Sequence, residues 1–235
     1  PSEMYGRDEN CKKWGKLYNF DENGITPYNW TEEDGVMSIT ATSGTGSYRE
    51  PDVVSYDSSN SVNLAQLETE FNNMIASVEK YGGFYIGRYE TGNLKKAEAV
   101  VVKNNSDTGS QTWYTQYNKS KGVAANNNVT TSMIWGCQWD AVMRWMWNQG
   151  GDKKTYTYDS TGKGNYSGSR KATGSDPEYA VNNIYDMAGN ISDWTIEAYG
   201  TTYRVYRGGY YNDNASGYPA SDRYNDPPTV SSSLN

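Results

Sequence analysis

The chain has 235 residues, of which 35% are hydrophobic and 14% are aromatic, and its formal net charge is −7. This length is enough to bury one substantial core, and the 22 tyrosines and 8 tryptophans argue against disorder, which is poor in aromatic residues. The acidic balance argues against a nucleic-acid partner, whose phosphates would be repelled, and the short apolar runs predict no membrane insertion.

Residues 1–60 predict a small strand-rich N-terminal extension, in which short apolar patches alternate with turn-forming residues. The run Met37–Thr42 alternates as a half-buried strand does. Asn23-Gly24 lies between two such patches and predicts a hairpin turn. Residues 61–235 are expected to form the main domain.

The clearest predicted helix follows this extension. Asn63 is a suitable N-cap with Gln66 three residues later, and Gly82-Gly83 ends the pattern near Tyr81. Between these signals the apolar residues recur at helical spacing: Leu64, Leu67, Phe71, Met74, Ile75 and Val78. The next segment, Phe84–Glu90, predicts a central strand.

The middle of the chain predicts a second strand around Val100–Val102 and a short helix over Gln111–Tyr117. Met133–Asn148 predicts another strong helix, with one face that is more typical of a core than of a cofactor site: Trp135, Trp139, Val142, Met143 and Met146. Cys137 lies on this helix. It could pair with Cys11, but two cysteines make no disulfide framework, so separate thiols are favoured. Gly150–Glu178 lacks periodicity and is interpreted as a surface loop.

The stretch Tyr185–Gly209 contains two motifs. Asp186-Met187-Ala188-Gly189-Asn190 predicts a tight turn before Asp193-Trp194, and Arg204–Arg207 is a β-prone run that ends on Gly208-Gly209. Together they resemble the N-x-x-GN-x-x-EW and RV-x-RGGS signature of the formylglycine-generating-enzyme (sulfatase-modifying-factor) superfamily. Gln138-Trp139-Asp140-Ala141 is similar to that family's E-W-E-x-A helix.

This resemblance covers about residues 84–235 and implies an α+β, C-type-lectin-like fold: two helices packed on a small twisted antiparallel sheet, with extensive irregular loops. The family's catalytic members bind copper through two cysteines just after the RGGS segment, but Tyr210–Asn235 contains no cysteine. A sister group of iron-dependent enzymes uses histidine ligands, and this chain has no histidine. We therefore expect no enzyme activity and no catalytic metal.

The resemblance also implies a structural calcium site. Its oxygen ligands would come from Asp186, Gly189, Ile191 and Asp193, because calcium takes several hard oxygen ligands from a tight loop. The alternative is an acidic turn in which Asp186 and Asp193 cap backbone amides.

The C-terminal segment is dominated by Tyr, Ser, Gly, Asn and Asp, the residue types of antibody binding loops. Gly208–Asn235 contains no Trp, Met, Lys, Glu or Gln. This pattern resembles the variable proteins of diversity-generating retroelements, in which mutation of Asn codons reaches Tyr, Asn, Asp, Ser, Gly, Ala and Pro but none of those five types. By this resemblance residues 208–235 form a variable region whose binding face comprises Tyr210, Tyr211, Asn212, Asp213, Gly217, Tyr218, Asp222, Tyr224, Asn225 and Asp226.

In such proteins fixed residues hold the backbone of the variable region, here Arg207, Gly208, Gly209, Ala220-Ser221 and Arg223. The resemblance implies a non-catalytic binder of a protein or glycan receptor on a target cell surface, located on a phage tail or on a bacterial cell surface. Two alternatives remain open. One is an oxidase of the formylglycine-generating type, and the other is a calcium-assisted, sugar-binding lectin.

Overall fold

The computed structural model describes residues 17–27, 29–33, 36–40, 47–49, 62–92, 111–123, 128–200 and 202–230, and these form a mixed α+β structure. Four α-helices are present in the described ranges: α1 (Leu64–Tyr81), α2 (Trp113–Ser120), α3 (Gly136–Trp147) and α4 (Gly151–Tyr158). A short 3-10 helix, η2 (Pro177–Tyr179), follows them in the chain.

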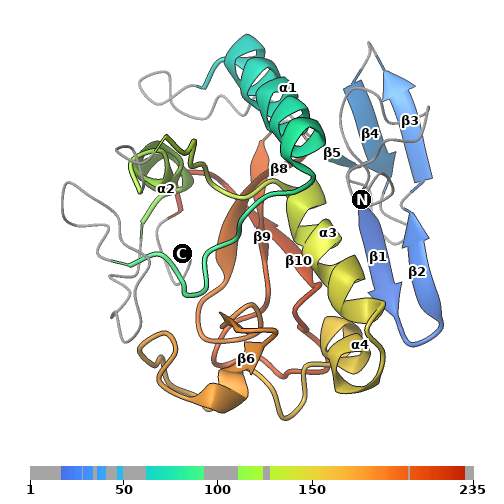
Figure 1. Ribbon diagram of the computed structural model, residues 1–235, viewed down its shortest axis with the longest axis vertical. Helices are drawn as coiled ribbons and strands as arrows, with labels where there is room; N and C mark the ends of the chain where they lie inside the picture. The colour runs from blue at the N-terminus through green and yellow to red at the C-terminus, as the bar shows by residue number, and fades with distance from the viewer. Residues whose placement is uncertain are drawn as a thin grey trace.

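The main sheet is antiparallel. Its strands lie in the order β10 (Arg223–Asp226), β9 (Tyr203–Arg207), β8 (Asp193–Tyr199), β5 (Ser47–Arg49), β4 (Val36–Thr40) and β3 (Asn29–Glu33). Two smaller antiparallel pairs are β1 (Tyr18–Asp21) with β2 (Gly24–Pro27), and β6 (Ala180–Val181) with β7 (Ile184–Tyr185). Figure 1 shows α1 and α3 in front of β8–β10, with β1–β4 along one flank.

The strands of the first sixty residues agree with the prediction from the sequence. The predicted strand at Met37–Thr42 is confirmed over Met37–Thr40 as part of β4, while its last two positions lie outside the described residues. The predicted hairpin is β1–β2. Its turn is centred one residue earlier than expected, because Asp21 Oδ1 accepts hydrogen bonds from the amides of Asn23 (2.8 Å) and Gly24 (3.1 Å). Through the pairing of β5 with β8, these strands continue the sheet of the C-terminal part.

The helix predicted after residue 63 is confirmed at both ends. Asn63 Oδ1 accepts the amide of Ala65 at 2.8 Å, and Gly82 ends the helix with a φ of +78°. Gln66 does not complete a capping box, however. Its side-chain amide instead donates to Glu70 (3.0 Å) and to the hydroxyl of Tyr117 on α2 (3.1 Å), because α2 packs beside this turn of the helix.

Two clusters of buried side chains make up the core. In the first, Leu67 and Phe71 of α1 pack with Trp194 and Ile196 of β8, and Phe71 meets Trp135 edge-on with ring centroids 5.0 Å apart; Val78 of α1 is also buried. Cys137 packs against this cluster, while Cys11 lies outside the described residues. The second cluster joins α3, α4 and β1, and the predicted apolar face of α3 contributes to both: Trp135, Trp139, Val142, Met143 and Met146.

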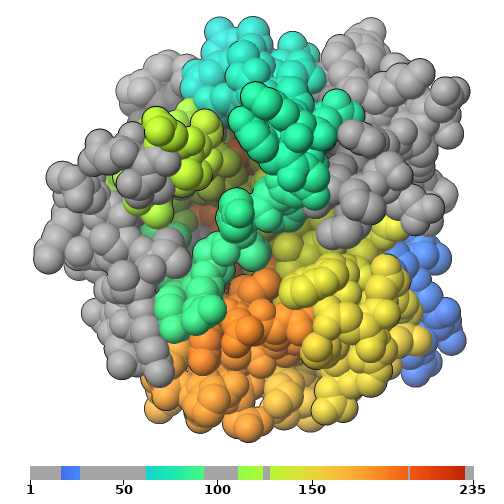
Figure 2. All heavy atoms as spheres, in the orientation of Figure 1, coloured from blue at the N-terminus to red at the C-terminus, as the bar shows by residue number. Residues whose placement is uncertain are grey.

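The predicted strand at Phe84–Glu90 is wrong. This segment belongs to no strand, and the side chain of Tyr85 is 101% exposed. Its backbone makes isolated bonds instead of a ladder, since Arg88 O accepts from the Tyr185 amide at 2.8 Å and the Glu90 amide donates to Thr173 Oγ1 at 3.1 Å. Figure 2 shows residues 82–92 crossing the molecular surface against the orange C-terminal half. The strand predicted at Val100–Val102 lies outside the described residues.

The prediction of a surface loop over Gly150–Glu178 is also wrong in part. Residues Gly151–Tyr158 form α4. The sequence does not predict this helix, because GDKKTYTY buries only Tyr156 and Thr157 and so has almost no apolar periodicity. Beyond α4, the backbone is irregular but includes fully buried polar residues, such as Ser160 and Asn165. The short helix predicted around Trp113 is confirmed as α2.

Candidate ligand-binding surface

Residues 208–222 form a long loop between two paired strands. Arg207 at the end of β9 and Arg223 at the start of β10 are partners in the antiparallel register. Both side chains point inward and are buried, whereas much of the loop between them is exposed. The geometry of this loop therefore depends on how the two arginines are held.

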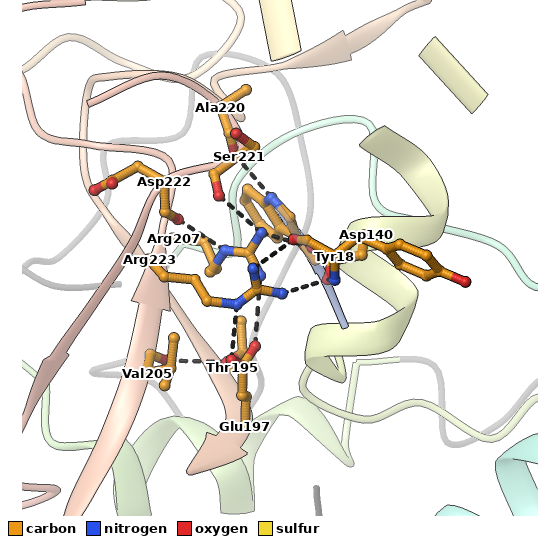
Figure 3. Close-up of polar contacts among 11 residues, drawn as sticks. Tyr18, Asp140, Thr195, Glu197, Val205, Arg207, Ala220, Ser221, Asp222 and Arg223 are labelled. Carbon is orange, nitrogen blue, oxygen red and sulfur yellow. Dashed lines mark hydrogen bonds and ion pairs between the residues drawn. The ribbon is translucent and has the colours of Figure 1, made fainter. Parts of the chain in front are cut away.

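A buried group of two arginines and two carboxylates holds both ends of the loop (Figure 3). Arg207 binds Asp140 of α3 at 2.7 Å and Glu197 of β8 at 3.4 Å. Arg223 binds the same two residues, with its Nε 2.8 Å from Glu197 Oε1 and its Nη2 against Asp140 Oδ2. Burial raises the pKa of Glu197, and the charges of Arg223 and Arg207 oppose this rise. The group is electrically balanced, which is the condition for placing charges in a core.

The same side chains also bind backbone atoms. Arg207 donates to the carbonyl oxygens of Asp222 (2.8 Å) and Ser221 (3.0 Å), and Arg223 donates to that of Tyr18 in β1 (2.7 Å). Each guanidinium therefore satisfies several acceptors at once and specifies the path of the chain at the end of the loop.

The loop begins at two glycines for a steric reason. Gly208 and Gly209 have φ angles of +88° and +71°, which disfavour other residues. A Cβ at Gly208 would lie 2.5 Å from the carbonyl oxygen of Met187, and one at Gly209 would lie 2.5 Å from that of Tyr218. Only glycine allows these close approaches of backbone to backbone.

Interior contacts anchor the far side of the loop. Trp139 Nε1 donates to the carbonyl of Ala220 at 2.8 Å, and the amide of Ala220 donates to Ser160 Oγ at 2.9 Å. The Tyr166 hydroxyl donates to the carbonyl of Tyr218 at 2.6 Å. These bonds use loop backbone atoms as partners, so they do not depend on the side chains that the loop displays.

None of the residues predicted to contact a ligand is buried. Tyr224 is 52% exposed and Tyr218 is 37% exposed, while Tyr210 and Tyr211 lie with their ring centroids 3.9 Å apart. The other predicted residues are partly or fully exposed: Asn212, Asp213, Gly217, Asp222, Asn225 and Asp226. The residues predicted as constant scaffold are buried: Arg207, Gly208, Gly209, Ala220, Ser221 and Arg223.

Tyr206 lies on β9 opposite Tyr224 of β10, a position that the sequence analysis did not single out. Burial raises the pKa of its hydroxyl, and the nearby charges of Asp226, Asp213 and Asp222 raise it further. Its ring also packs on that of Tyr224, with centroids 5.6 Å apart. Ionisation of this tyrosine is therefore opposed by its burial and by acidic residues of the predicted face.

The carboxylate of Asp222 points away from the buried arginines, although its carbonyl oxygen binds Arg207 (Figure 3). Burial raises the pKa of this carboxylate to about 6, with opposing effects from Arg207 and from the Arg223 amide. Burial also raises the pKa values of Asp213 and Asp226. These carboxylates therefore become harder to ionise in the folded protein.

An open cavity of about 540 Å³ lies beside the loop. One side is formed by the turn after α4 and by η2, through Thr161, Tyr166, Ser167 and Tyr179, and the other by Asp213–Ser216 of the loop. The sequence analysis missed every cavity residue except Asp213. No local pattern in residues 161–179 indicates that they meet the C-terminal segment, which lies far away in the chain.

In the turn predicted to bind calcium, Asp186 makes the kind of contact that the alternative interpretation expects. Asp186 Oδ2 accepts hydrogen bonds from Thr173 Oγ1 (2.7 Å) and from the Gly174 amide (3.1 Å), so this carboxylate caps the protein's own groups. Within the described ranges, no three His, Cys, Asp or Glu residues gather as a metal-binding group. These contacts do not make the turn a good fit for calcium, whose site at Asp186, Gly189, Ile191 and Asp193 stays a prediction.

In the part of the chain that the structure describes, no helix combines the length and the apolar character that a bilayer crossing requires. No family model, curated protein or solved structure matches this chain. A function for the chain must therefore be argued from its own residues.

Proposed function

We propose that this chain is a non-catalytic binding protein that displays a variable C-terminal surface on a C-type-lectin-like fold. The observation that carries the proposal is the separation of two kinds of residue within 207–226. The positions predicted to form the binding face are exposed or partly exposed, and the positions expected to stay constant are buried.

The buried ion pairs support this proposal because they hold the two ends of the loop in place. Asp140 and Glu197 hold Arg207 and Arg223, and these two residues bracket the loop. Because surface substitutions usually change stability by less than about 0.5 kcal/mol, exchange of the exposed side chains leaves such a scaffold intact. A loop anchored through its backbone and its ends can then present many sequences in one geometry.

The composition of the exposed face supports recognition. Tyrosine offers a rigid contact area at a low entropic cost, and Asn, Ser and Asp supply adaptable hydrogen bonds. Tyr218 and Tyr224 offer their rings to solvent, as expected of anchors for a partner. The partner that we propose is a receptor on a cell surface, and the location that we propose is a phage tail or a bacterial surface.

A library experiment tests the proposal. The predicted face residues are replaced together, each by random choice among Tyr, Asn, Asp, Ser, Gly and Ala, and single clones are examined by thermal unfolding. We expect most clones to unfold cooperatively. A matched library at Arg207, Ala220, Ser221 and Arg223 should yield mostly unfolded protein, and equal tolerance in the two libraries would contradict the proposal.

Comparison of gene copies provides a second test. If the segment is diversified, differences between copies concentrate in the codons of the exposed face and spare those of the buried residues. A C-terminal segment that never differs would instead favour the lectin or oxidase alternative.

A further inference from the structure

We infer that the cavity between the loop and residues 161–179 is a binding subsite for a neutral saccharide unit, with one constant wall and one variable wall. The inference rests on the proposed function in one respect only, which is that Asp213–Ser216 belong to the variable region. The cavity itself follows from the fold. Its volume of about 540 Å³ lies within the range of small-molecule sites.

The first wall is held rigidly by the interior. Gly164, with a φ of +81°, lies so close to Ala188 that a Cβ would be 2.1 Å from its carbonyl oxygen. Asn165 is completely buried, and its side-chain amide donates to Asn190 Oδ1 (2.8 Å) and to the Ser169 carbonyl (3.0 Å). These contacts lock the turn that presents Thr161 and Ser167.

Backbone hydrogen bonds join this wall to the variable loop. The amide of Ser160 donates to the carbonyl of Ala215 at 3.1 Å, and the amide of Gly168 donates to that of Tyr211 at 2.9 Å. The two walls are therefore held at a defined separation by bonds that do not involve displayed side chains. A ligand in the cavity would contact constant and variable residues simultaneously.

The chemistry of the lining selects the ligand class. Thr161, Ser167 and Tyr179 on one wall face Asp213, Asn214 and Ser216 on the other. Hydroxyl, amide and carboxylate groups match the alternating donors and acceptors of a sugar, and the tyrosine rings can cover its apolar face. Among the described residues, the lining contains no Lys or Arg and no aliphatic side chain larger than Ala, so it is unsuited to anions and to apolar peptides.

Of the lining residues that the structure describes, Asp213 alone carries a charge. Within the described part of the chain, its carboxylate accepts one hydrogen bond, from the Tyr210 amide to Oδ2 at 2.9 Å. Its second oxygen can therefore accept from a ligand hydroxyl. Asn214 Oδ1 is already used, since it accepts from the Gly217 amide (2.7 Å) and from Ser216 Oγ (2.8 Å), so a ligand would meet the amide nitrogen of Asn214.

The test uses the methyl glycosides of glucose, galactose, mannose and N-acetylglucosamine, together with lactose and cellobiose, as probes of the full chain. Binding is measured by saturation-transfer NMR and by calorimetry at millimolar sugar, in the presence of a chelator. N-acetylneuraminic acid and acetylated argininamide are the charged comparison probes. We expect at least one neutral sugar to bind, and neither charged probe to bind more tightly.

A variant of the constant wall locates the site. Thr161→Trp fills the cavity from a residue outside the variable region, and Thr202→Trp places the same bulk on an exposed turn elsewhere. We expect Thr161→Trp to raise the Kd for the sugar by ~tenfold or more, and Thr202→Trp to leave the Kd unchanged. Thermal unfolding checks that both variants fold.

Three results would overturn the inference: no binding of any neutral sugar, tighter binding of a charged probe, or sugar binding that Thr161→Trp leaves intact. These outcomes are separate from failure of the proposed function. A fold that tolerates the face library but binds no sugar keeps the display proposal, and the receptor is then a protein. A fold that binds sugar but rejects the library keeps the subsite alone.

Discussion

Arg207 and Arg223 face each other across the β9–β10 register and share the same two carboxylates, Asp140 and Glu197. One arginine ends the strand that enters the loop, and the other begins the strand that leaves it. The ion pairs of these two arginines in the core therefore hold both ends of the exposed loop.

This relationship predicts a large loss of stability when one partner is removed. Arg223→Ala leaves Asp140 and Glu197 with an excess of buried negative charge, which costs about 3–5 kcal/mol. Urea unfolding should show this decrease, whereas Arg170→Ala, at an exposed position, should change stability by less than about 0.5 kcal/mol. Equal effects of the two substitutions would mean that the ion-pair group does not hold the loop.

The displayed tyrosines predict the opposite behaviour. Each single substitution by Ser should shift the free energy of unfolding by less than about 1 kcal/mol, because none of the four rings is buried: Tyr210, Tyr211, Tyr218 and Tyr224. The control is Tyr117→Ser, which removes a buried ring stacked on Trp113 and should cost about 3–5 kcal/mol. Failure of the quadruple Ser variant to fold would show that these tyrosines belong to the core.

The apolar face of α1 supplies a third prediction. Phe71 is completely buried against Trp135, so Phe71→Ala should reduce the free energy of unfolding by about 3–5 kcal/mol. Asn73→Ala, on the exposed side of the same helix, is the matched control and should have little effect. Chemical denaturation of the two variants measures the difference, and an unchanged midpoint for Phe71→Ala would remove α1 from the core.

Asp222 predicts a dependence of stability on pH. Its pKa is about 6 in the folded protein against an ordinary value of 3.8, so the folded state binds the proton more tightly than the unfolded state. The contribution of Asp222 to the free energy of unfolding is therefore most favourable below pH 4, decreases as the pH rises toward 6, and is constant above pH 6. The full shift corresponds to about 3 kcal/mol, and partial exposure of the side chain reduces this figure.

Asp222→Asn should accordingly stabilise the protein above pH 6 and leave it nearly unchanged near pH 4. Urea unfolding at several pH values measures this difference, with Asp152→Asn on the exposed side of α4 as the control that keeps the wild-type slope. If Asp222→Asn and the wild type have parallel pH profiles, the burial of Asp222 does not affect its proton affinity.

The turn at Asp186 predicts the response to a chelator. Because Thr173 and Gly174 already donate to its carboxylate, we expect EDTA to leave the Tm unchanged. A calcium ion bound at Asp186, Gly189, Ile191 and Asp193 would instead stabilise the native state by mass action, so that chelation would lower the Tm. A decrease that calcium reverses, and that Asp193→Ala abolishes, would establish the calcium site.

Local signals were sufficient for several elements. Asn63 and Gly82 marked both ends of α1, because capping requires only residues next to the helix. The spacing of Trp139, Met143 and Met146 indicated the buried face of α3 for a similar reason. The strand prediction for Phe84–Glu90 was wrong because Phe84, Tyr85 and Ile86 are β-prone residues, but no strand in the described residues pairs with this segment.

The sequence by itself therefore determined the helices with strong periodicity, because that periodicity depends on residues close together in the chain. It also determined the composition, including the lack of histidine and the residue types of the C-terminal segment. Only the tertiary structure decided that Asp140 and Glu197 meet Arg207 and Arg223, and that residues 161–179 form a cavity with Asp213–Ser216. Both arrangements join segments far apart in sequence. Their formation depends on how α3, α4 and the sheet pack, which no local pattern of residues encodes.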